Sequence, residues 1–129
     1  MSHDHRPVGV PEIDVRELVR RRRESDGGPD GPLVVDVRES GEVVAGRIEG
    51  AMLLPLSQFV RRFRELPADR PLAIVCQSGQ RSAMAAAFLA ANGYPGAANV
   101  IGGMIAWQMA GLPVRHGPLD GDEGGRPAG

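Results

Sequence analysis

The sequence predicts one α/β domain, in which helices cover both faces of a mostly parallel β-sheet. Its 129 residues suit a single domain with one sizeable core. Short apolar runs, typical of buried strands, alternate along the chain with segments of helical periodicity. This alternation is typical of βα units, whose strands run parallel.

The first half of the chain opens with a helix start signal. Asp14 can cap a helix, and Glu17 three residues later completes a capping-box pattern. The β-branched run at 33–37 (LVVDV) predicts a buried strand. The pattern then predicts a short helix over 39–45 and a strand over 51–54.

The second half continues the alternation. Ser57 caps a predicted helix over 57–66, and the apolar run at 72–76 (LAIVC) predicts another buried strand. The Ala-rich segment 82–92 is strongly helical. A short strand over 99–101 and a last helix over 104–109 complete the predicted domain.

The two ends of the chain differ in composition from the middle. Residues 1–9 are polar, and we expect them to be flexible. Residues 117–129 (GPLDGDEGGRPAG) are rich in Gly, Pro and Asp, which predicts a disordered tail. The sequence therefore predicts a folded domain over 10–116.

Composition excludes several classes of protein. A formal net charge of -1 argues against a nucleic-acid binder, and no apolar run has the length of a membrane helix. Cys76 is the only cysteine, so the chain can form no internal disulfide and no multi-cysteine metal site. His3, His5 and His116 lie near the ends without a further ligand, so we expect no metal and no cofactor. The lone thiol and the lack of a signal-peptide pattern favour the cytoplasm.

The strongest candidate site is the turn that follows the predicted strand at 72–76. Ligands of such sheets bind at the carboxyl ends of the strands, and Cys76 stands at such an end. A tight strand–loop–helix turn directs backbone N–H groups inward as an anion nest, and the helix N-terminus and Arg81 add positive charge. These groups lower a cysteine pKa, and the thiolate is the nucleophile. We therefore expect Cys76 and Arg81 to be catalytic. The predicted substrate-binding residues are Gln77, Ser78, Gly79, Gln80 and Ser82.

A passive role for Cys76 is the alternative interpretation. Free cysteine is among the most buried residue types, and the apolar run before Cys76 favours such a role. The polar, Gly-containing loop directly after it favours the functional role. Asp36 and Arg38, at the end of the other buried strand, either orient this loop or form a structural hydrogen-bonded pair. The structural pair is the favoured interpretation.

Four segments in order resemble the rhodanese family. Residues 76–82 (CQSGQRS) resemble its active-site loop, and residues 35–38 (VDVR) with Glu39 its strand-end signature. Residues 46–55 (GRIEGAMLLP) resemble its Gly-His-Ile-x-Gly-Ala…Pro segment, and residues 100–107 (VIGGMIAW) its Gly-Gly-x-x-x-Trp segment. One segment alone is a weak signal, but four in the right order and spacing are a specific one.

The resemblance extends from about Val10 to Pro113, with two departures from the family pattern. Arg47 stands where the family usually has His, and Val43 where an aromatic residue is common. Neither lies in the cysteine loop, so we expect them to affect local packing more than catalysis.

The resemblance implies a three-layer domain with a five-stranded, mostly parallel sheet, and a sulfurtransferase that works through a persulfide on Cys76. Thiosulfate or a persulfide would donate the sulfur, and cyanide, a thiol or a carrier protein would accept it. No second cysteine can resolve the persulfide internally, so release goes to another molecule in a ping-pong scheme. We expect a monomer or weak dimer that binds neither nucleic acid nor membrane.

Two other functions stay open from the sequence. The same fold also hosts dual-specificity phosphatases and arsenate reductases, which resemble tyrosine phosphatases in a loop one residue longer. Here only four residues separate Cys76 from Arg81, and the smaller nest suits a single sulfur atom better than a tetrahedral oxyanion. The other alternative is a non-catalytic binding or sensor module, against which the intact Cys76 and Arg81 argue.

Overall fold

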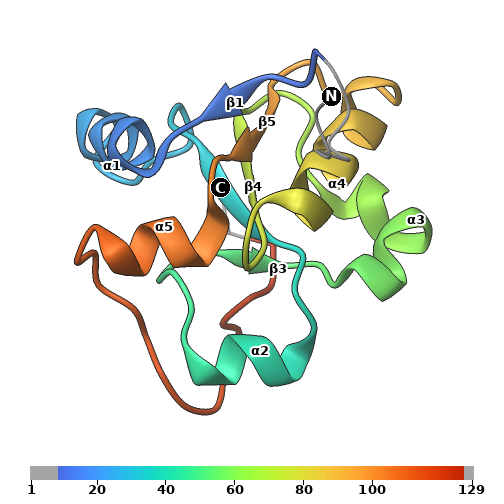
Figure 1. Ribbon diagram of the computed structural model, residues 1–129. Helices are drawn as coiled ribbons and strands as arrows, with labels where there is room; N and C mark the ends of the chain where they lie inside the picture. The colour runs from blue at the N-terminus through green and yellow to red at the C-terminus, as the bar shows by residue number, and fades with distance from the viewer. Residues whose placement is uncertain (1–8, 127–129) are drawn as a thin grey trace, which may run out of the picture.

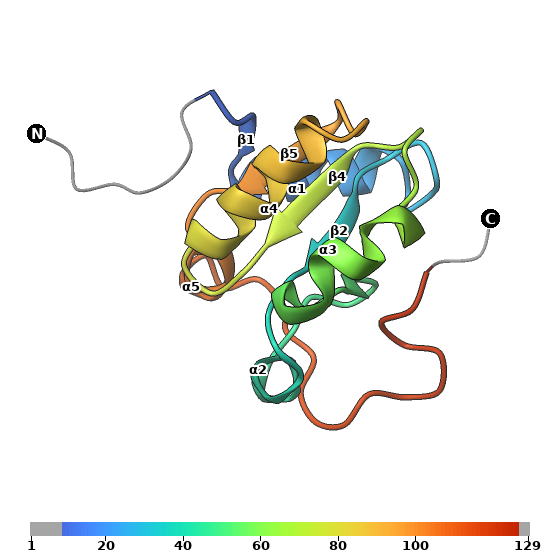
Figure 2. The same ribbon diagram turned by 90° about the vertical axis from the view of Figure 1, so that its right-hand side faces the viewer.

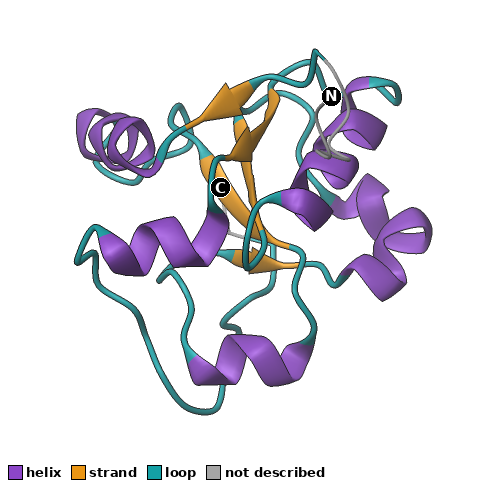
Figure 3. Ribbon diagram, viewed as in Figure 1, coloured by secondary structure: helices purple, strands orange, loops and turns teal. Residues whose placement is uncertain are grey.

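The computed structural model describes residues 9–126 and confirms the predicted α/β fold. Five strands form one sheet, and every pairing within it is parallel. In spatial order the strands are β1 (Glu12–Ile13), β5 (Ala97–Val100), β4 (Leu72–Val75), β2 (Leu33–Asp36) and β3 (Met52–Leu53) (Figures 1 and 3). The predicted flexible N-terminus lies almost wholly outside the described residues.

Helices cover both faces of this sheet. The helices α1 (Val15–Glu24) and α5 (Gly103–Met109) pack on one face, and α3 (Phe59–Arg62) and α4 (Gln80–Ala90) on the other (Figures 1 and 2). The short helix α2 (Ser40–Ala45) follows β2 at the carboxyl end of the sheet. None of the helices in the described part of the chain could cross a membrane.

The alternation of side chains along β4 decides which way Cys76 points. Leu72, Ile74 and Cys76 belong to the apolar cluster beneath α3 and α4. Ala73 and Val75 belong to the cluster beneath α1 and α5. Because successive side chains of a strand point to opposite faces, the Cys76 side chain lies on the α4 side of the sheet.

Apart from shifts of about two residues in the bounds of other elements, the structure differs from the predicted elements in two places. The strand β1 has only two residues and was not predicted, because it contains no apolar run. The helix predicted over 57–66 is divided into the 3₁₀ turn η1 (Leu56–Gln58), α3 and the 3₁₀ turn η2 (Phe63–Glu65). The Ser57 hydroxyl does not cap it, because it donates to Glu39 Oε1 at 2.7 Å.

Arg47, which replaces the usual His, is buried and holds part of the C-terminal tail. Its guanidinium donates to Glu123 Oε2 at 2.7 Å and to the Gly117 carbonyl oxygen at 2.6 Å. A buried cation requires such partners. For residues 117–126 the structure therefore differs from the disordered tail expected over 117–129, of which the last three residues lie outside the described part.

Asp36 and Arg38 form a buried ion pair at the end of β2, as the favoured interpretation expected. The Arg38 Nη2 and Nε atoms donate to Asp36 Oδ2 and Oδ1 at 2.7 and 3.0 Å. The same guanidinium donates to the carbonyl oxygens of Gly46 and Glu42, at 2.8 and 3.3 Å. The pair thus fixes α2 against the carboxyl end of the sheet.

We predict that Arg38→Leu lowers the free energy of unfolding by about 3–5 kcal/mol, because it leaves the Asp36 carboxylate buried without its partner. Urea denaturation would measure the change. The matched variant Arg16→Leu, at an exposed position of α1, should change stability by about 0.5 kcal/mol or less. Similar losses in the two variants would contradict a structural role for the pair.

Candidate active site

The turn between β4 and α4 is shaped by Gly79. β4 ends at Val75, and α4 begins at Gln80 with Gly79 as its N-cap, two residues earlier than the sequence predicted. Gly79 has a φ of +103°, in the left-handed region that favours glycine. This conformation brings the Gly79 N–H to 3.1 Å from Cys76 Sγ.

Hydrogen-bond donors of the loop converge on the sulfur atom of Cys76. Besides the Gly79 N–H, the Ser82 N–H lies 3.4 Å and the Ser82 hydroxyl 3.2 Å from Sγ. Burial raises the pKa of the Cys76 thiol, but hydrogen bonds from the Ser82 hydroxyl and from the N–H groups of Ser82, Gly79 and Ser78 outweigh burial and leave this pKa lowered. The turn therefore stabilises a buried thiolate, as an anion nest does.

Asn99 of β5 orients the Ser82 hydroxyl. The Ser82 Oγ lies 2.6 Å from Asn99 Oδ1, and both side chains are buried. A hydroxyl has one proton, so it can donate to Asn99 while accepting from a protonated thiol, or turn to donate to the Cys76 thiolate. Asn99 thus keeps the Ser82 hydroxyl within hydrogen-bond distance of Cys76 Sγ, whether the sulfur is a thiol or a thiolate.

The start of α5 locks the cysteine loop in place. The N–H groups of Met104 and Ile105 donate to the carbonyl oxygens of Cys76 and Gln77, at 2.9 and 3.1 Å. The two backbones approach so closely that a Cβ on Gly103 would lie 2.3 Å from the Cys76 oxygen. Only glycine fits here, which gives the Gly-Gly-x-x-x-Trp segment a physical reason.

Arg81 points to a carboxylate of α2. Its Nη2 and Nη1 atoms donate to Glu42 Oε1 and Oε2 at 2.7 and 2.9 Å, and this contact holds the pKa of Glu42 at about 2. The positive charge expected to act on the thiolate is thus largely compensated by Glu42. Because Arg38 also binds the Glu42 carbonyl oxygen, the buried pair at the end of β2 is linked to Arg81 through α2.

The structure gathers the predicted site residues around one loop. Gly79 and Ser82 are buried and contact the sulfur atom. Gln77, Ser78 and Gln80 are exposed, so their side chains form the outer rim of the loop.

Two residues with a role in the site were missed from the sequence. Glu42 was part of a predicted helix, and its place in the first turn of the helix that follows β2 is the signal that could have indicated it. Asn99 is a polar residue within an apolar strand, which is the usual sign of a buried hydrogen bond.

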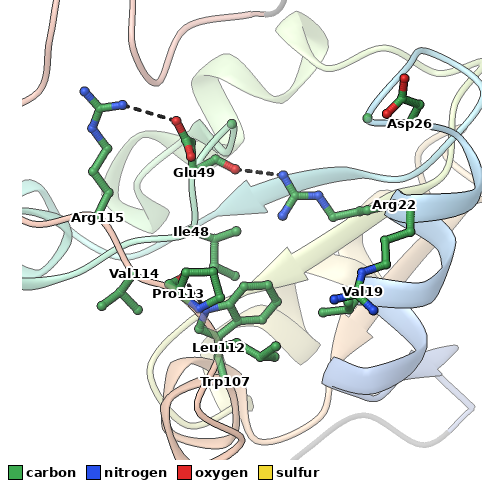
Figure 4. A pocket seen from close by; sticks show the side chains of 13 residues that line it. Val19, Arg22, Asp26, Ile48, Glu49, Trp107, Leu112, Pro113, Val114 and Arg115 are labelled. Carbon is green, nitrogen blue, oxygen red and sulfur yellow. Dashed lines mark hydrogen bonds and ion pairs between the residues drawn. The ribbon is translucent and has the colours of Figure 1, made fainter.

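A hollow of about 800 Å³ lies away from this loop, between the C-terminal half of α1 and the segment after α5 (Figure 4). Apolar side chains such as Ile48 and Trp107 line it, and Arg22 donates across it to the Glu49 carbonyl oxygen at 2.7 Å. No residue of the loop 76–82 takes part in its lining. The candidate chemistry therefore belongs to the loop and not to this larger hollow.

We predict that the pKa of Cys76, followed by the pH dependence of iodoacetamide alkylation, lies below that of a free cysteine. Ser82→Ala removes the hydroxyl donor and should raise this pKa. Arg81→Ala should raise it less, because Glu42 already compensates the guanidinium. A wild-type thiol with an ordinary pKa would show that the donors do not stabilise the thiolate.

Comparison with known proteins agrees with this geometry. Residues 14–110 match the sequence model of the Rhodanese-like domain. A protein named sulfurtransferase from Allochromatium vinosum is 39% identical over 105 residues, covering 81% of this chain and 94% of that protein. Thiosulfate sulfurtransferase GlpE from Actinobacillus succinogenes is 34% identical over 85 residues, covering 66% of this chain and 77% of that protein.

A solved structure shares the fold. The rhodanese-related protein of Thermoplasma volcanium superimposes with a TM-score of 0.72 at 30% identity, over 81% of this chain and 97% of the other. The family match covers most of the folded domain and includes the cysteine loop. The chain therefore belongs to the rhodanese-like domain family.

Proposed function

We propose that the protein is a sulfurtransferase, which takes a sulfane sulfur from thiosulfate or a persulfide and passes it to a thiophilic acceptor through a persulfide on Cys76. The convergence of the Gly79 and Ser82 donors on Cys76 Sγ carries this proposal. Such donors stabilise a thiolate before the reaction and a negatively charged sulfur after it. Relatives named as sulfurtransferases support the same chemistry.

In the loading step, the Cys76 thiolate attacks the outer sulfur of thiosulfate. A bond forms between Sγ and that sulfur, the sulfur–sulfur bond of thiosulfate breaks, and sulfite leaves with the electron pair. The product is Cys76–S–S⁻, and the total charge is conserved. The loop is short and its N–H groups point inward, so it suits one additional sulfur atom.

The unloading step requires another molecule. Cys76 is the only cysteine in the sequence, so no second thiol of the chain can displace the sulfur. A thiophile such as cyanide, a thiol or a carrier protein attacks the outer sulfur, and the electron pair of the broken bond returns to Cys76 Sγ. This gives the ping-pong order expected of a covalent intermediate.

Arg81 is the catalytic cation in this proposal, although its charge is compensated. The guanidinium lies in the cysteine loop, and its ion pair with Glu42 is about one-third exposed. Its N–H groups that do not bind Glu42 can donate to an anionic sulfur donor, while its contact with Glu42 connects the loop to α2. The outer rim of the loop is uncharged and consists of the exposed residues Gln77, Ser78 and Gln80. We expect the sulfur donor to cross this rim on its way to Cys76.

The proposal also covers the extent of the folded domain, its oligomeric state and the compartment in which it acts. We propose that the domain predicted over residues 10–116, whose Arg47 binds Gly117 and Glu123 of the following segment, acts as a monomer or weak dimer. A single reactive thiol is best kept reduced in the cytoplasm.

We predict that incubation with thiosulfate adds one sulfur atom to the protein, seen by intact-mass analysis and removed by cyanide. Cys76→Ser should show no addition, because the hydroxyl cannot form the persulfide. Asn99→Ala should load more slowly than wild type, because Ser82 loses its orienting partner. A wild-type protein that gains no sulfur from any of several donors would contradict the enzymatic function and favour a binding module.

We also predict no appreciable hydrolysis of aryl phosphates. Only four residues separate Cys76 from Arg81, so the loop offers little space to a tetrahedral phosphate. Release of p-nitrophenol from its phosphate ester should be no faster than with Cys76→Ser. Cys76-dependent phosphatase turnover that exceeds sulfur transfer would reverse the assignment.

A further inference from the structure

An apolar groove of about 500 Å³ runs beside the cysteine loop. One wall comes from residues 56–60 and the other from one face of α4. The α4 residues are spaced three or four apart, so they form a row that leads away from the loop. The lining residues are Leu56, Phe59, Val60, Gln80, Arg81, Met84, Ala85 and Phe88.

The groove has a packed floor and exposed walls. Phe59 and Ala85 are buried, and the Phe59 ring packs edge-on against Phe88 at 5.9 Å between centroids. Val60 and Met84 stand above this floor and are 70% and 59% exposed. Apolar side chains exposed together around a depression indicate a binding surface.

The groove lies on the same side of the sheet as the Cys76 side chain. Cys76 packs in the cluster beneath α3 and α4, two helices that lie on the same side of the sheet (Figure 2). Residues of both helices line the groove. Gln80 and Arg81, the last two residues before Ser82, belong to both the loop and the groove. A molecule that reacts at the loop can therefore extend along the groove.

The charge of the groove indicates which kind of molecule fits. Among residues 9–126, Arg81 is the only charged residue that lines the groove, and Glu42 compensates this charge. The remaining lining side chains are apolar except for the uncharged Gln80. The groove is thus complementary to an uncharged apolar chain and not to an anionic one. Its volume lies in the range of small-molecule sites.

We propose that this groove binds the apolar part of a low-molecular-weight thiol that accepts the sulfur from Cys76. The inference rests on the proposed sulfurtransferase function and specifies its acceptor. The acceptor thiol gives its proton to the persulfide anion Cys76–S–S⁻, its thiolate sulfur attacks the outer sulfur, and the bond from that sulfur to Sγ breaks. The electron pair stays on Sγ, which returns as the thiolate, and the acceptor leaves as R–S–SH. No oxidant or reductant takes part.

The test follows the discharge of the loaded protein to mercaptoalkanols of two, four, six and eight carbons. These thiols are uncharged beyond the thiol group and differ mainly in apolar length. Protein loaded by thiosulfate is mixed with each thiol, and the rate of sulfur loss is divided by the rate measured with cyanide. Each methylene buried in the groove should raise the relative rate by about twofold to fourfold.

Two variants with the same substitution locate the effect. Met84→Gln makes one wall of the groove polar and should reduce the dependence on chain length. Met109→Gln lies in α5 on the other face, where Met109 is 84% exposed, and should leave that dependence unchanged. Because both methionines are exposed, neither change should prevent folding.

Each outcome decides the inference. The inference is supported if the relative rate rises with the length of the thiol, and if this rise is smaller in Met84→Gln but unchanged in Met109→Gln. Rates independent of chain length, with discharge to cyanide retained, would overturn the groove while leaving sulfur transfer standing, and would favour a protein acceptor. If the dependence of the rate on thiol length falls equally in both variants, the apolar part of the thiol binds elsewhere, and the inference is overturned. Failure to load sulfur at all would overturn the proposed function itself.

Discussion

The contact between the cysteine loop and the start of α5 is the constraint on which the site depends. Two backbone hydrogen bonds join the Cys76 and Gln77 carbonyl oxygens to α5, and Gly103 permits the close approach. With the loop fixed there, the Gly79 N–H and the Ser82 groups meet at one sulfur atom. The site is therefore preorganised by the backbone, and its N–H donors need no rearrangement when charge develops on the sulfur.

Much of the fold could be predicted because its signals are local. The apolar runs at 33–37 and 72–76 identify the central strands β2 and β4, which are buried on both faces. The position of Cys76 at a strand end, before a Gly-containing loop and a helix, indicated the candidate site. Asp14 was predicted to begin a helix, and its side chain accepts the Glu17 N–H at 2.8 Å. Each of these features is contained in fewer than about ten neighbouring residues.

The features that were missed depend on contacts between distant parts of the chain. The strand β1 is defined by its pairing with β5, and the partners of Arg81 and Ser82 come from α2 and β5. The composition of residues 117–126 predicts disorder, yet buried Arg47 requires an anion, and Glu123 of this segment supplies it. A sequence pattern shows that a residue is charged, but not which distant residue compensates that charge.

Stabilisation of sulfur by N–H and hydroxyl groups, with the nearby arginines bound to carboxylates, is the central claim of this account. A crystal structure of the protein after incubation with thiosulfate tests it most directly. We expect one additional sulfur atom bonded to Cys76 Sγ inside the loop, within hydrogen-bond distance of its N–H groups, while Arg81 remains on Glu42. An unmodified Sγ, or an added sulfur held by Arg81 outside the loop, would contradict the account.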